Sequence, residues 1–60
     1  MTSVGYDGQT NVLEIEFADG DTYRYFAVPA SVHSALLVAD SLGAFFARRI
    51  RHTYTCEKVG

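Results

Sequence analysis

The chain has 60 residues and a formal net charge of −2, which limits it to one small domain without the overall basic charge of a general nucleic-acid binder. Its composition is 48% hydrophobic, with four tyrosines and four phenylalanines, so a compact core is expected and disorder is not. Cys56 is the only cysteine, which excludes an internal disulfide and a cysteine pair for a metal. A domain this small buries only about 60% of the surface that its unfolded chain exposes, so self-association is one expected way to add stability.

Membrane insertion and secretion find no support in the sequence. The longest apolar run, 35–39, is far too short to cross a bilayer. Met1-Thr2-Ser3 lacks the positive charge that opens a secretion signal. A free thiol without such a signal fits a reducing compartment, and we therefore expect a soluble cytoplasmic protein.

The first half of the chain predicts an antiparallel meander. Residues 3–6 can form a first strand, and the turn formers of 7–11 close it. Residues 12–17 alternate apolar and acidic side chains, which is typical of a half-buried strand. The turn at Asp19-Gly20 then leads into a third strand over 22–27.

The register of the second hairpin decides which aromatic rings are buried. A two-residue loop would turn Tyr23 and Tyr25 toward the glutamate face, whereas a three-residue loop through position 21 turns both rings into the core. The longer loop pairs Ile15 with Tyr25. It also places Glu16 opposite Arg24, which matches opposite charges across the strands. We expect this second register, with the tyrosines facing the core.

The second half predicts two short helices. Pro29 suits the first position of a helix, because its φ is fixed and its missing N–H is not needed there. Apolar residues recur at helical spacing over 32–39, and Asp40 or Ser41 ends this helix and can cap the next. Gly43 is expected at the C-terminal end of the first helix or at a close approach between the two helices.

These elements predict an α+β fold in which a three-stranded antiparallel meander is covered by two short helices. The second helical pattern spans 45–50, and 54–59 can return as a fourth edge strand. The expected core consists of Leu13, Ile15, Phe17, Tyr23, Tyr25, Val32, Leu36, Phe46 and Ile50.

In order and spacing, residues along almost the whole chain resemble the KTSC domain, a module of about this length named after the C-terminal extension of some lysyl-tRNA synthetases. The matching residues are Ile15-Glu16-Phe17, Gly20, Tyr23-Arg24-Tyr25-Phe26, Val28-Pro29, Leu36-Leu37, Ser41-x-Gly43, Phe45-Phe46, and Ile50-Arg51 followed by Tyr54. The resemblance implies one KTSC-like domain over residues 1–60, in the stand-alone form found in bacteria. The family has no established activity, and its link to a synthetase implies RNA or tRNA as a partner.

The charges of the chain are unevenly distributed. The first forty residues carry six carboxylates and one arginine, a net −5, whereas the last twenty carry four cations and one glutamate, a net +3. Three arginines within four residues could contact a phosphate backbone. The residues expected to bind nucleic acid are Arg48, Arg49 and Arg51, with Tyr54 and Arg24 as secondary contacts. The alternative is structural, because the arginines could favour a helix dipole or pair with Glu14 and Glu16.

Other chemistry has little support. Tyr23 and Tyr25 could stack on bases, but the register favours their burial. His33 is expected on the polar flank of the first helix. His52 and Cys56 are too few ligands for a zinc site, and no nucleophile has a base beside it, so we expect no metal, no cofactor and no enzymatic activity.

Two functional hypotheses remain. The first is a small non-catalytic module that binds RNA or another polyanion with little sequence preference. The alternative is a protein-interaction or self-assembly module, for example a homodimer, that uses an edge strand or a helix face. Phe26 would then need a covering partner, because the expected register puts its ring on the glutamate face of the sheet.

Overall fold

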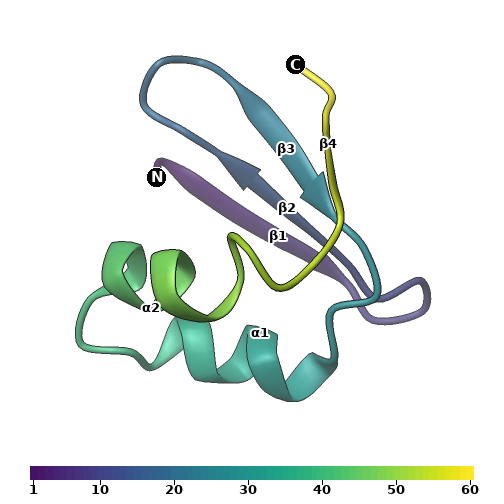
Figure 1. Cartoon of the computed structure of the whole chain (residues 1–60), viewed down its shortest axis with the longest axis vertical. Coiled ribbons are helices and arrows are strands. Elements are labelled where there is room, and N and C mark those ends of the chain that lie inside the picture. Colours follow the sequence, from purple (N-terminus) through teal and green to yellow (C-terminus); the bar gives the residue numbers. More distant parts are fainter.

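A computed structural model describes all 60 residues as a four-stranded antiparallel sheet with two helices on one of its faces (Figure 1). The elements are β1 (Ser3–Asp7), β2 (Val12–Glu16), β3 (Thr22–Tyr25), α1 (Ala30–Leu37), α2 (Leu42–Arg49) and β4 (Cys56–Lys58). The strands are ordered β1-β2-β3-β4, so β1 and β4 form the edges. The expected α+β class and the fourth edge strand are both confirmed.

The register of β2 and β3 differs from the expected one by two residues. Ile15 lies opposite Tyr23, and Arg24 lies opposite Glu14 where Glu16 was expected. The hairpin loop consists of residues 18–20. It is closed by a hydrogen bond from the Phe17 N–H to the Asp21 carbonyl at 2.8 Å.

The conformation of this loop explains the shift. Gly20 takes a φ of 92°, which favours glycine at the end of a three-residue hairpin loop. The Asp19 carboxylate accepts a hydrogen bond from the Asp21 N–H at 3.0 Å, which fixes the turn one residue earlier than expected. A shift of two residues leaves the faces of a strand unchanged, so Tyr23 and Tyr25 still face the helices.

The core lies between the sheet and the two helices. Its buried members are Leu13, Ile15, Tyr25, Val28, Leu36, Phe46 and Ile50. All of these except Val28 were expected, whereas Phe17, Tyr23 and Val32 are half-buried and pack around the core. Val28 was missed because it follows β3 in a connection with no periodic pattern, where its N–H donates to the Asn11 carbonyl at 2.9 Å.

The helix ends correct two details of the prediction. Pro29 is the N-cap of α1, with φ −63° and ψ 150°, and not its first helical residue. Ser41 caps α2 as expected, since its hydroxyl accepts from the Ala44 N–H at 3.2 Å. Gly43 lies in the first turn of α2 with nothing within 4 Å of an added Cβ, so it neither ends α1 nor permits a close helix approach.

The sheet has one covered face and one open face. The pairing of the strands places Gly5, Glu14, Arg24 and Glu57 in one row on the open face. We call it the acidic row after its two carboxylates, Glu14 and Glu57, which point away from both helices. Neither helix has the length and apolar content needed to cross a bilayer.

Candidate nucleic-acid interface

The C-terminal end of α2 presents the arginine cluster, which we define as Arg48, Arg49 and Arg51. All three side chains are exposed. The buried Ile50 anchors this end of the helix, and the N–H groups of Ile50 and Arg51 both donate to the Phe46 carbonyl, at 3.0 and 2.9 Å. The chain then turns back, with the Tyr54 N–H donating to the Ile50 carbonyl at 3.3 Å. A buried anchor therefore holds the arginine cluster at the surface.

No carboxylate pairs with the arginine cluster. The two ion pairs of the structure join Arg24 to Glu14 at 2.9 Å and Lys58 to Asp21 at 3.3 Å. The expected alternative pairing with Glu14 and Glu16 does not occur, because both glutamates lie on the side of the sheet away from the helices. Arg49 instead lies over the Phe45 ring, with its guanidinium carbon 5.9 Å from the ring centre.

The helix divides the arginine cluster between two depressions. A depression of about 310 Å³ is lined by Arg48 and Arg49, together with the hydroxyl-bearing Ser31, Thr53 and Tyr54. These hydroxyls can donate to a phosphate oxygen. Sequence reasoning missed Ser31 and Thr53, because residues more than twenty positions apart meet there only through the packing of α1 beside the end of α2.

Arg51 lines a separate groove of about 640 Å³ between α2 and the sheet. Arg51 follows the C-cap of α2, so the helical spacing that places Arg48 and Arg49 does not apply to its side chain. His52 lies beside it at the rim. The three arginines that are adjacent in sequence therefore form two neighbouring contact points.

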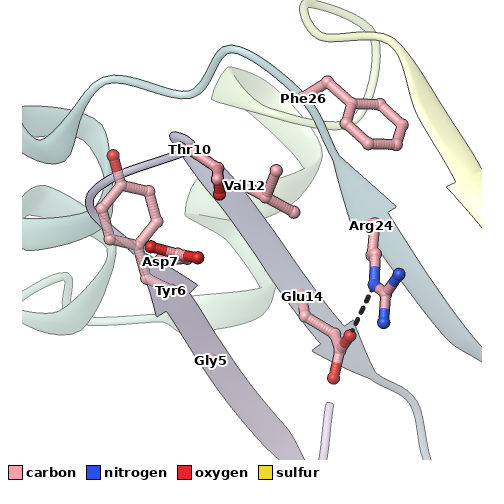
Figure 2. A pocket seen from close by; sticks show the side chains of 8 residues that line it. All are labelled: Gly5, Tyr6, Asp7, Thr10, Val12, Glu14, Arg24 and Phe26. Atoms are coloured by element: carbon pink, nitrogen blue, oxygen red, sulfur yellow. Dashed lines mark hydrogen bonds and ion pairs between the residues drawn. The ribbon is translucent and has the colours of Figure 1, made fainter.

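Of the two secondary residues, the structure brings only Tyr54 to the arginine cluster. Tyr54 is half-buried, packs against the core and lines the smaller depression. Arg24 lies on the opposite face of the sheet, in a third depression of about 410 Å³. Figure 2 shows its guanidinium turned toward Glu14, with Val12 and Phe26 beside it.

The two core-facing rings of β3 differ in how much of each reaches the surface. Tyr25 is 4% exposed and packs edge-on against Phe46, with ring centres 5.3 Å apart. Burial raises the pKa of the Tyr25 hydroxyl, and the nearby Cys56 adds to this effect while Arg51 opposes it. Tyr23 is half-buried and keeps part of its ring at the groove beside Arg51.

His33 is not on a polar flank, and this expectation was wrong. Its ring is half-buried and stacks on Tyr6, with centres 4.5 Å apart and planes inclined by 13°. The Tyr6 hydroxyl in turn donates to the Val28 carbonyl at 2.6 Å. Contacts of this kind join β1 to α1 and leave no local trace in the sequence.

Metal-binding groups are dispersed over the structure. No three side chains among the histidines, the cysteine and the carboxylates lie close enough together to hold a metal ion. Cys56 is exposed on β4 with its thiol free. The chemistry at the end of α2 is therefore that of arginine side chains and hydroxyl groups.

Comparisons with known proteins give a consistent match. The family model described as the KTSC domain matches residues 1–54, which include every candidate residue. An uncharacterized protein from Stutzerimonas stutzeri is 54% identical over 46 residues, which make up 77% of this chain and 65% of that protein. A lysine–tRNA ligase from Nostoc punctiforme is 39% identical over 54 residues, covering 90% of this chain but only 10% of the ligase.

A solved structure agrees with these matches. The crystal structure of a KTSC domain protein from Yersinia pestis superimposes with a TM-score of 0.90 and 39% sequence identity. The alignment covers 97% of this chain and 82% of the Yersinia chain. The sheet and both helices therefore have counterparts in an experimental structure.

Proposed function

This chain belongs to the KTSC domain family, and on that premise we propose that it is a small non-catalytic module that binds RNA or another polyanion at the end of α2. The observation that carries the proposal is the exposure of Arg48, Arg49 and Arg51 without a carboxylate partner. Exposed guanidinium groups keep their full set of donors for phosphate oxygens.

The distribution of charge supports this choice of surface. The acidic row on the open face lies away from the helices, so it does not neutralise the arginine cluster directly. Arg48 and Arg49 also occupy the last turn of α2, where they balance the partial negative charge of the helix end. A phosphate in the smaller depression would meet Arg48, Arg49 and the hydroxyls of Ser31 and Thr53.

The names of the related proteins support RNA as the class of ligand. Several matching proteins are lysine–tRNA ligases, in which the matching segment makes up 10% of the length. The tRNA in their name is a polyanion. A binding segment attached to such an enzyme, or acting without it, needs no catalytic groups of its own.

We expect the protein to bind a fluorescein-labelled single-stranded RNA of twelve nucleotides at about 50 mM salt, measured by fluorescence anisotropy. The logarithm of the affinity should fall with the logarithm of salt at a slope of about −0.7 per phosphate contact, and two or three contacts fit the arginine cluster. Replacing Arg48, Arg49 and Arg51 together by glutamine should weaken binding at least tenfold.

Arg24→Gln is the matched control for this experiment. It also removes an arginine from a surface position, but on the opposite face of the sheet. We expect its affinity for the RNA to stay within twofold of the wild-type value. Absence of binding at low salt, or an equal loss in the Arg24 variant, would contradict the proposed site.

A second candidate function is self-assembly or protein binding, and one observation favours it. Large apolar side chains are exposed around the connection between the helices, with Leu37 56% and Val38 82% exposed, and Leu42 adjoins them. Exposed apolar patches mark interaction surfaces. This patch lies at the start of α2, away from the arginine cluster at its end.

A further inference from the structure

The groove beside Arg51 has the size and the walls of a ligand site. Its volume of about 640 Å³ lies within the range of roughly 300–1,000 Å³ that is typical of small-molecule sites. On the α2 side its wall is formed by Gly43 and Ala47, one helical turn apart. An added Cβ at Gly43 meets nothing within 4 Å, so the groove is open beside this residue.

Aromatic rings line the groove on the side of the core. Phe17 contacts Tyr23 and Phe46 edge-on, with ring centres 5.8 and 5.6 Å apart. Phe17 and Tyr23 are only half-buried, so part of each ring remains available at the groove. Such rings suit a planar, aromatic ligand, because every nucleobase has a face that can stack.

The two rims of the groove differ in charge. Arg51 and His52 border it at the end of α2, whereas Asp19 and Asp21 border it from the β2–β3 loop. Each aspartate uses its Oδ1 atom, Asp19 for the Asp21 N–H at 3.0 Å and Asp21 for Lys58 at 3.3 Å. The Oδ2 atoms remain able to accept hydrogen bonds from N–H groups of a ligand.

We propose that this groove holds one nucleotide of a single-stranded RNA. The base stacks on the face of one of the two rings, Phe17 or Tyr23, and meets the other edge-on, because the two rings stand at 77° to each other. Its N–H edge points toward the aspartates, and the phosphate binds Arg51. The following phosphates then pass over the end of α2 to Arg48 and Arg49. This inference rests on the proposed function and adds to it a preference for bases over bare phosphates.

The test compares a labelled guanine-containing RNA hexamer with an abasic ribose-phosphate hexamer of the same charge. We expect the wild-type protein to bind the RNA at least tenfold more tightly than the abasic strand. Ala47→Leu fills the groove without changing the charge, and it should remove this preference while the affinity for the abasic strand is retained. The matched control is Ala44→Leu, at an exposed position of the same helix that does not line the groove.

The outcomes separate the two proposals. Equal binding of both strands by the wild-type protein, or a preference that survives Ala47→Leu, would overturn the nucleotide site alone. Failure of the wild-type protein to bind either strand would overturn the polyanion function and this site with it.

A measurement on the unmodified protein checks the site without relying on a variant. In ¹H–¹⁵N spectra, guanosine monophosphate should shift the amide signals of Gly43, Ala47 and Tyr23, and ribose 5-phosphate should leave them in place. Shifts confined to residues outside the groove would contradict the assignment.

Discussion

Tyr25 combines a buried ring with an ionisable hydroxyl near the arginine cluster. Its ring fills the core between β3 and α2, and burial raises the pKa of the hydroxyl above the usual 10.0. In the unfolded chain the pKa returns to its ordinary value. The folded state therefore binds the phenolic proton more tightly, and this residue links stability to alkaline pH.

We expect the contribution of Tyr25 to the free energy of unfolding to be complete below pH 10 and to be lost as the pH rises through the raised pKa. Urea unfolding at a series of alkaline pH values measures this loss, and absorbance at 295 nm follows the tyrosine ionisation. Tyr25→Phe should remove the last ionisation step and flatten the alkaline decline in stability. A variant with the same alkaline decline as the wild-type protein would show that another group is responsible.

Among the elements, α2 carries the proposed function and depends most on its surroundings. It has eight residues, too few for an isolated helix to be stable in water. Its Ser41 cap, the buried Phe46 and the buried Ile50 just after its end hold it in place. Loss of any of these should affect the position of the arginines as well as stability.

Ser41→Ala should lower the free energy of unfolding by about 1 kcal/mol, because the hydroxyl that accepts from the Ala44 N–H is lost. Urea denaturation monitored by circular dichroism gives the value. Ser34→Ala is the matched control, since Ser34 is an exposed residue inside α1 and alanine has the higher helix propensity there. Equal destabilisation by both changes would argue against the cap.

At the scale of the whole molecule, three surfaces point in different directions. The open face of the sheet carries the acidic row and the Arg24–Glu14 ion pair. The end of α2 carries the arginine cluster, and the connection between the helices carries the apolar patch. The patch and the cluster are separated by the length of α2, about 12 Å at 1.5 Å per residue.

The apolar patch gives the alternative function a direct test. If it mediates self-assembly, sedimentation velocity should show a dimer whose fraction grows with protein concentration. The double substitution Leu37→Ser and Val38→Ser should then keep the protein monomeric, while RNA binding by the distant arginine cluster is unchanged. A wild-type protein that stays monomeric over the whole concentration range would remove self-assembly through this patch.

Local patterns in the sequence were enough to predict the class and order of the elements. Alternation along 12–17 identified β2 and its inward face, and helical spacing with Ser41 identified α1, α2 and the cap between them. These signals are local, because a strand or helix records its buried face in the spacing of its own residues. The family resemblance, now confirmed by the family model, also rests on the order of such local groups.

Contacts between residues that are far apart in the chain could not be predicted in this way. The loop at 18–20 shifts the register of β2 and β3 by two residues from the expected one, so that Arg24 lies opposite Glu14. Packing buried Val28, and stacked His33 on Tyr6 from another element. The arginine cluster was visible in the sequence, but its division between two depressions was not. The physical reason is that a local pattern fixes the direction of a side chain within its element, whereas its partners are chosen by contacts across the fold.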